Sequence, residues 1–265
     1  MTLSVGSDPE FFLRDSKGEL ITAIGLLGGT KRNPRKTKHG WLQEDGVAAE
    51  FNSIPSKTLQ SFIENHRLVM EDLNNIISPM GISLDMSASL EFDKDLLLSH
   101  QATTSGCDPD FNAWERQENE SPDLYDTSIR ATGGHLHIAF DGVDDLESRL
   151  SFVKVLDMEL GVPSVLLDND KLRRKMYGQA GAFRPKIESR DGFNGIEYRV
   201  LSNFWLKNED YMKFIWEKIQ FCNDNWKELI AKAESLKEEI VYNINSCDYY
   251  TSKLFCEKQG VVSYV

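Results

Sequence analysis

The 265-residue sequence has few cysteines, no long apolar run and no excess of positive charge. Its four cysteines lie far apart and form no Cys-x-x-Cys pair, which argues against a disulfide framework or a zinc ribbon. No window approaches the roughly eighteen apolar residues that a membrane helix needs. The net charge of -12 argues against a nucleic-acid partner. Since the N-terminus also lacks the features of a signal peptide, we expect a soluble, cytoplasmic protein with reduced thiols.

The composition is that of an ordinary globular protein, with 40% hydrophobic and 27% charged residues. Its length allows one large α+β domain or two small ones, and we favour a single domain over residues 1–265. Positive charge is concentrated between Lys171 and Arg199, where eight basic residues stand against three acidic ones. Such a segment in an acidic protein suits a small polyanion such as a nucleotide, and a solvated basic loop is the simpler alternative.

Hydrophobic periodicity predicts alternating strands and helices. Strands are expected at residues 4–14, 19–24, 47–52, 82–92, 134–141 and 194–203, and helices at 55–77, 146–160 and 209–233. The second helix should follow Asp144 and end at Gly161-Val162-Pro163. Residues 25–44 and 99–132 are expected to form loops, and the last thirty residues are ambiguous. The order of elements predicts an α+β fold with an antiparallel sheet and helices against one face.

Four of the predicted strands carry carboxylate, imidazole or guanidinium groups on one face. Side chains two residues apart on a strand share a face, opposite their apolar neighbours. For any single strand, a sheet with one wet face explains this alternation. The whole set contains no lysine and little threonine, and carboxylates and imidazoles are ligands for Mg²⁺ or Mn²⁺. We therefore predict a divalent-metal site on the face that carries Asp8, Glu10, Glu50, His135, His137, Glu197 and Arg199.

Two short motifs support this hypothesis. In Gly133-Gly134-His135-Leu136-His137, two imidazoles share a face beside backbone that a ligand can approach closely. In Glu197-Tyr-Arg199, a guanidinium lies about 7 Å along the strand from a predicted metal ligand. This arrangement suits a phosphate held between a metal and an arginine fork. A simple ion pair is the alternative for these two residues taken alone.

Five segments occur in the order Gly6-Ser-Asp-Pro-Glu10-Phe, Asp45-Gly-Val-Ala-Ala-Glu50-Phe-Asn, Gly133-Gly-His-Leu-His137, Ala180-Gly-Ala-Phe-Arg184 and Glu197-Tyr-Arg199-Val. As a set they resemble the phage-type carboxylate-amine ligases, a branch of the glutamine synthetase and glutamate-cysteine ligase superfamily. The similarity extends from about Val5 to Trp205, and the segments Gly28–Pro34 and Cys107–Trp114 also resemble the family. The chain is much shorter than a full glutamine synthetase and lacks a counterpart of its separate N-terminal domain. Ring assembly and ammonia specificity therefore do not carry over.

The resemblance implies a glutamine synthetase-like fold, in which a curved antiparallel sheet carries helices on its outer face. It also implies two or three divalent ions, Mg²⁺ or Mn²⁺, between the sheet and the phosphates of ATP. Glu10, Glu50, His137 and Glu197 fall at metal-ligand positions, with Asp8 and Glu91 as further candidates. The candidates for phosphate, substrate and nucleotide contacts are Arg184, Arg199, His135, Arg173, Arg174 and Lys31. The implied ligase core spans about residues 5–205, with a helical extension over 206–265.

The predicted reaction is ATP-dependent: a carboxylate is phosphorylated, and an amine attacks the acyl phosphate to form an amide or peptide-like bond. The substrates would be small molecules or peptides, and a homo-oligomer is compatible with the sequence. One alternative is a metal-dependent hydrolase of amides or phosphoesters. Another is a phage structural or interaction protein that keeps the fold without activity. A P-loop kinase is excluded, because the segment beginning at Gly25 has Thr30 in place of the second glycine and Arg32 in place of serine or threonine.

Overall fold

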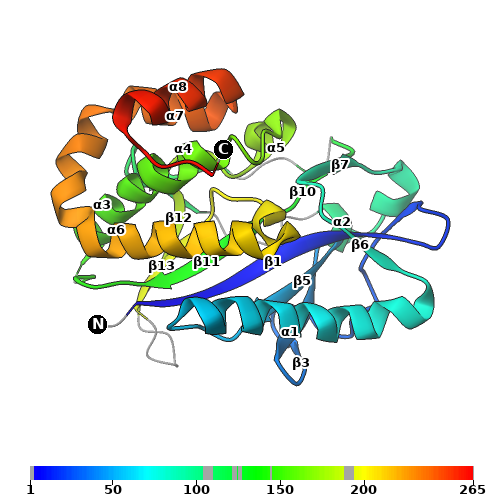
Figure 1. Ribbon diagram of the computed structural model, residues 1–265. Helices are drawn as coiled ribbons and strands as arrows, with labels where there is room; N and C mark the ends of the chain where they lie inside the picture. Colours follow the sequence, from blue (N-terminus) through cyan, green and yellow to red (C-terminus); the bar gives the residue numbers. More distant parts are fainter. Residues whose placement is uncertain are drawn as a thin grey trace.

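The structure is a computed structural model that describes residues 3–103, 110–120, 124, 127–143, 145–187 and 194–264. Its centre is an antiparallel sheet of order β3-β4-β5-β1-β11-β13-β12-β8-β9, with β2 and β6 also paired to β1 (Figure 1). The strands of this sheet are β1 (Ser4–Arg14), β2 (Leu20–Ile21), β3 (Arg35–Lys36), β4 (Gly40–Asp45), β5 (Ala48–Ser53), β6 (Ser83–Asp85), β8 (Phe111–Asn112), β9 (Gln117–Glu118), β11 (Gly134–Ala139), β12 (Ala182–Lys186) and β13 (Gly195–Tyr198). A separate two-stranded sheet pairs β7 (Ser89–Glu91) with β10 (Ile129–Ala131).

The helices are α1 (Leu59–Ile77), α2 (His100–Thr103), α3 (Leu146–Leu156), α4 (Val162–Ser164), α5 (Lys171–Met176), α6 (Glu209–Ser235), α7 (Lys237–Ser246) and α8 (Tyr249–Gln259). Several of them cover one face of the central sheet (Figure 1). Of these, α1, α3 and α6 contact the sheet or each other, while α7 and α8 lie beyond α4, farther from the strands (Figure 1). The predicted α+β fold, an antiparallel sheet with helices against one face, is confirmed.

The apolar side chains of the long strands form the core between the sheet and the helices. Phe11 of β1 stacks on Phe51 of β5, with ring centroids 5.6 Å apart. Phe62 of α1 packs on Trp205 at 5.6 Å and on Trp216 of α6 at 5.5 Å. The polar residues between the apolar strand positions therefore face the opposite side of the sheet. This alternation, expected from the sequence, positions the candidate site.

The structure differs from the predicted elements in three long segments. Residues 25–44, predicted to be a loop, contain β3 and β4. The predicted strand 82–92 is two short strands, β6 and β7, which belong to different sheets. The helix expected to end at Gly161-Val162-Pro163 continues through a π-helical turn, Asp157–Gly161, into α4. Pro163 has no backbone N–H, so it cannot continue the hydrogen-bond pattern of the π-helical turn, and it stands in the first turn of α4.

Some predicted features lie in or beside segments that the structure does not describe. The residue expected to precede the second helix, Asp144, is outside the described residues, and Asp145 caps α3. The predicted loop 99–132 is described only in part, and that part contains α2, β8, β9 and β10. Cys107 is also outside the described residues, while the other three cysteines are buried and unpaired. In the described portion of the chain, no helix is long and apolar enough to cross a membrane.

Candidate active site

The face of the sheet opposite the helices brings together the charged residues predicted from four separate strands. Asp8 of β1 lies opposite His135 of β11, and Glu10 lies opposite Glu50 of β5. On the other side of β11, His137 lies opposite Glu197 of β13, which in turn lies opposite Arg184 of β12. Directly opposite side chains in an antiparallel pair are close neighbours. The strand register therefore converges residues that are far apart in the chain.

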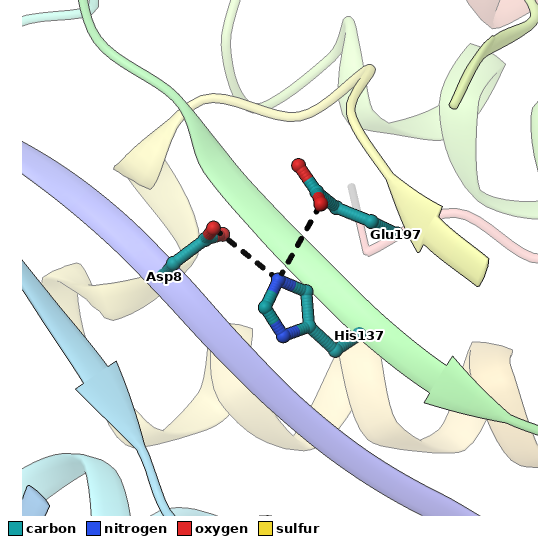
Figure 2. Close-up of side chains that lie close together, drawn as sticks. All are labelled: Asp8, His137 and Glu197. Carbon is teal, nitrogen blue, oxygen red and sulfur yellow. Dashed lines mark ion pairs between the residues drawn. The ribbon is translucent and has the colours of Figure 1, made fainter. Parts of the chain in front are cut away.

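Asp8, His137 and Glu197 form a first group, the His137 cluster (Figure 2). His137 Nε2 lies 3.2 Å from Asp8 Oδ2 and 3.9 Å from Glu197 Oε2, so both carboxylates point toward the same nitrogen (Figure 2). Among the described residues, Asp8 Oδ1 and His137 Nε2 have no hydrogen-bond partner although both atoms are buried. Buried polar atoms normally have a partner. Two carboxylates and an imidazole around one point fit a divalent cation.

Glu10, Asp45 and Glu50 form a second group, the Glu10 cluster, whose ligand atoms lie within 4.8 Å of one another. Burial raises the pKa of Glu10 to about 8, and Asp45 adds to the effect. Burial, followed by repulsion from Asp8 and Asp45, also raises the pKa of Glu50 well above its usual range. Three converging carboxylates repel one another in the absence of a cation, because they share a site of low polarity. Hard oxygen donors of this kind suit Mg²⁺ or Mn²⁺.

Neutral donors fix the orientation of the carboxylates in the Glu10 cluster. The backbone N–H of Gly133 donates to Glu10 Oε2 at 2.8 Å. Gln43 Nε2 donates to Glu50 Oε1 at 2.7 Å, and Gln43 lies directly opposite Glu50 in the sheet. Partners that hold a ligating carboxylate in place are a common feature of metal sites. The Glu10 cluster is therefore a preorganised group of acceptors.

Three cationic side chains surround the carboxylate of Glu197, which is only 1% exposed. Lys186 Nζ lies 2.7 Å from Glu197 Oε2, and Arg184 Nη1 lies 3.3 Å from Glu197 Oε1. Arg199 Nη1 also contacts Glu197 Oε1, and Arg199 Nε donates to Asp110 Oδ2 at 3.0 Å. Guanidinium and ammonium groups at one edge of the His137 cluster are suited to phosphate.

His135 of β11 contacts both Asp8 and Tyr177. Its Nδ1 lies 3.2 Å from Asp8 Oδ1, and its Nε2 lies 3.0 Å from the hydroxyl oxygen of Tyr177. Burial, aided by Arg199, lowers the pKa of His135 to about 4, so the imidazole is neutral near pH 7. Burial alone would raise the pKa of Asp8, but His137 and His135 hold it well below its usual range. Asp8 is therefore an ionised acceptor.

Two of the residues predicted to bind nucleotide, Arg173 and Arg174, hold backbone segments together. Arg173, which is 1% exposed, donates to the carbonyl oxygens of Thr132, Val200 and Leu201, each at 2.8 Å. Arg174 donates to the Val200 carbonyl oxygen at 2.6 Å. These buried arginines fasten α5 to the end of β13, because a guanidinium carries enough donors to serve several carbonyls at once. Their contact with a nucleotide, expected from the sequence, stays a prediction.

Two other predicted residues lie outside the clusters. Glu91 is exposed on β7, in the two-stranded sheet, where its Oε1 accepts a hydrogen bond from Ser128 at 2.8 Å. Among the described residues it belongs to neither cluster, and its role as a metal ligand stays a prediction. Lys31 lies in an exposed turn that Thr30 and Asn33 close by hydrogen bonds between their backbones. Its contact with a nucleotide stays a prediction.

Sequence reasoning missed five residues of the site: Gln43, Asp45, Asp110, Tyr177 and Lys186. Asp45 and Asp110 lie within segments that resembled the ligase family, and that resemblance was the available signal. Lys186 is two residues from Arg184 and shares its face, but β12 contains Pro185 and was not predicted to be a strand. Tyr177 follows the short helix α5, which has no apolar periodicity.

Residues 127–245 match the family described as phage phiEco32-like COOH.NH2 ligase-type 2. The resemblance found in the sequence is thereby confirmed over the segment that carries His137, Arg184 and Glu197. The strands that carry Asp8 and Glu50 precede it. Comparison with curated proteins finds no match.

Two solved structures are similar over most of the chain. A bifunctional glutathione synthetase from Pasteurella multocida aligns with 98% of this chain and 50% of its own, at 12% identity and a TM-score of 0.49. A novel glutamine synthase homolog aligns with 98% of this chain and 68% of its own, at 12% identity and a TM-score of 0.41. The chain thus spans about half the length of the glutathione synthetase.

Proposed function

We propose that this chain is an ATP-dependent carboxylate-amine ligase that works through an acyl phosphate. The observation that carries the proposal is the position of the Glu197 carboxylate, which lies between a candidate metal ligand and a group of cationic side chains. Its Oε2 faces His137 and Lys186, and its Oε1 faces Arg184 and Arg199. The match to a ligase family supports the same reaction class.

The donor sets of both clusters fit Mg²⁺ or Mn²⁺, and the proposed ligase would hold one ion at each. Asp8, His137 and Glu197 would bind one ion, and Glu10, Asp45 and Glu50 the other. Bound there, the ions would shield the triphosphate and the incoming carboxylate from each other. Asp8 Oδ1 and His137 Nε2 are buried and make ion-pair contacts but no hydrogen bond of regular geometry, and this favours such an occupant.

The cationic side chains would stabilise the transferred phosphoryl group, whose charge spreads over its outer oxygens. The guanidinium of Arg199 is fixed by Asp110 and Glu197 and is preorganised for that role. Lys186 is a third exposed and has a flexible stem, so its ammonium group can turn from Glu197 toward a phosphate. Arg184, next to Lys186 on the same face, would contact the same anion or the substrate carboxylate.

The proposed reaction has two bond-forming steps. A carboxylate oxygen of the first substrate attacks the γ-phosphorus of ATP, and the bond to ADP breaks. The amine nitrogen then attacks the acyl carbon, the bond to phosphate breaks, and the nitrogen loses a proton. Neutral His135, which is next to Asp8, is a candidate to orient the substrate or accept that proton. We further propose that one ligase core over residues 5–205 carries this site and that residues 206–265 form its helical extension.

The test is to incubate the protein with ATP, Mg²⁺ and pooled amino acids, and to measure ADP and new product masses. We expect ADP to form only when the correct carboxylate is present and to stop when a chelator is added. With that carboxylate and no amine, ATP labelled at the bridging oxygen should show positional isotope exchange. Amide or phosphoester cleavage without nucleotide would instead support the hydrolase alternative and overturn the ligase.

A further inference from the structure

Tyr177 lies between the protein surface and the most buried polar groups of the site. It follows α5 directly and is half-buried, whereas Arg199 and His135 are almost fully buried. Arg173 of α5 anchors this segment to three carbonyl oxygens of the sheet and its flanking backbone. Gly178, next in the chain, has a positive φ of 70°, which lets the backbone turn immediately after the tyrosine. The position of Tyr177 is therefore fixed by its neighbours in the chain.

The guanidinium of Arg199 lies over the face of the Tyr177 ring. Arg199 Cζ lies 5.0 Å from the ring centroid, and Arg173 Cζ lies 5.5 Å from it. At its edges, Arg199 contacts Asp110 and Glu197. A cation over a ring within about 6 Å is attracted by the ring quadrupole, most strongly when both are desolvated. The ring thus limits how the Arg199 guanidinium can tilt, and the carboxylates of Asp110 and Glu197 fix its edges.

The hydroxyl group of Tyr177 acts on a different part of the site. It lies 3.0 Å from His135 Nε2, and the two rings meet edge to face with centroids 5.5 Å apart. On the far side of the imidazole, His135 Nδ1 lies 3.2 Å from Asp8 Oδ1. Phenol, imidazole and carboxylate therefore form a chain that ends in the His137 cluster. Removing the hydroxyl would leave a buried ring nitrogen without this partner.

We propose that Tyr177 is a positioning residue with two separable parts. The ring holds Arg199 in the orientation that binds a phosphate-bearing ligand. The hydroxyl holds His135, and through it Asp8, in the orientation that binds a divalent cation. This inference rests on the proposed ligase function, but its two parts concern binding of an anion and of a cation, which can be measured without turnover.

Two substitutions separate the parts, because Tyr177→Phe removes only the hydroxyl and Tyr177→Leu removes the ring as well. The probes are Mn²⁺ alone, followed by electron paramagnetic resonance, and ADP at saturating Mg²⁺, followed by calorimetry. We expect Tyr177→Phe to bind Mn²⁺ about tenfold more weakly, as for loss of a partner behind a metal ligand, and to keep its affinity for ADP within about twofold. Tyr177→Leu should show the same loss for Mn²⁺ and bind ADP about 5- to 30-fold more weakly.

The matched controls are Tyr250→Phe and Tyr250→Leu, because Tyr250 is a strongly exposed tyrosine on α8, outside the site. Both should bind Mn²⁺ and ADP like the wild type. If Tyr177→Leu fails to fold, Tyr177→Met takes its place, since methionine keeps an apolar side chain of similar length. A Tyr177→Phe protein with wild-type affinity for Mn²⁺ would overturn the role of the hydroxyl. Equal ADP affinity in the Phe and Leu variants would overturn the role of the ring.

The same measurements distinguish failure of this inference from failure of the proposed function. If the wild type ligates substrates but the Tyr177 variants behave like the controls, the positioning role is wrong and the ligase stands. If the variants lose binding as expected but no carboxylate stimulates ADP formation, the positioning role stands and the ligase is wrong. A wild type that binds neither Mn²⁺ nor ADP overturns both.

Discussion

Replacing Glu197 by glutamine and replacing Glu50 by glutamine should change metal-free stability in opposite directions. Both substitutions keep the side-chain volume and remove one buried negative charge. Glu197 is surrounded by cations, with Lys186 and Arg184 at 2.7 and 3.3 Å. Glu50 is surrounded by carboxylates, and repulsion by Asp8 and Asp45 adds to burial in raising its pKa well above the usual range. The two residues therefore report on opposite electrostatic environments.

The magnitude for Glu197→Gln follows from the contacts that the carboxylate makes. Removing one member of a buried ion pair costs about 3–5 kcal/mol of unfolding free energy, because the partner charge stays buried. The glutamine oxygen can still accept a hydrogen bond from Arg199, and Lys186 is a third exposed, so we expect about 2–4 kcal/mol. In a chain of this size, that loss lowers Tm by roughly 5–15 °C. Loss of the proposed ion at the His137 cluster should also slow phosphorylation of the carboxylate about a hundredfold.

For Glu50→Gln, the expected change in the stability of the metal-free protein has the opposite sign, so the variant should be more stable. A carboxyl group whose pKa is raised on folding destabilises the fold once the pH exceeds the pKa that the group has in the unfolded chain. Glutamine removes this penalty and keeps an oxygen that can accept the hydrogen bond from Gln43, so Tm should rise at pH 8. Mn²⁺ affinity should nevertheless fall, because a ligand is lost. The exposed residue Glu71 provides the control, and Glu71→Gln should change neither quantity.

The assays are thermal unfolding with and without saturating Mn²⁺, and ADP formation at a temperature well below both transitions. Metal should raise the Tm of the wild type more than that of either variant. The reasoning would be refuted if Glu197→Gln were as stable as the wild type, since the three cations around it would then contribute nothing. It would also be refuted if Glu50→Gln were destabilised without metal, because the repulsion within the Glu10 cluster would then be absent.

Three further predictions concern single residues. Arg199→Lys should lower the rate of ADP formation about tenfold or more, because a planar fork becomes a point charge; unchanged kinetics would assign Arg199 to an ion pair alone. Asp157 accepts hydrogen bonds from Trp114, Tyr198 and Gly181, and burial raises its pKa to about 6, so its contribution to stability should fall as the pH rises from 4 to 6. Asp157→Asn should remove that pH dependence in unfolding experiments. Glu91→Gln should bind Mn²⁺ with wild-type affinity, since Glu91 belongs to neither cluster, and a tenfold loss would assign Glu91 as a ligand.

The long strands could be predicted from the sequence because a period of two is visible in each. In β1, Asp8 and Glu10 alternate with buried residues such as Phe11, and β5, β11 and β13 repeat the pattern. The short strands could not be predicted in this way, because two residues show no period. The short helix α5 also lacks an apolar stripe, since its buried side chains are those of Arg173 and Arg174.

Local charge was a poor guide to which basic residues face the site. Arg173 and Arg184 lie in the same basic segment of the sequence, yet the first serves backbone carbonyls and the second contacts Glu197. The difference arises from the elements that carry them. Arg184 is on a strand of the site face, where its direct neighbour across the sheet is Glu197. Arg173 is on a helix packed at the sheet end, where buried backbone carbonyls require donors. Charge per segment cannot distinguish these environments.

The register of the sheet connects the fold to the electrostatics of the site. Glu10 and Glu50 lie directly opposite each other on adjacent strands, an arrangement that destabilises a sheet when both are ionised. On the other face, Phe11 stacks on Phe51 with centroids 5.6 Å apart, and this apolar pair fixes the same register. A slip of one residue would turn the aromatic rings out of the core, so the carboxylates cannot move apart by shifting the strands. The packing energy of the helix face therefore holds the carboxylates together, and a divalent cation between them would turn their repulsion into attraction.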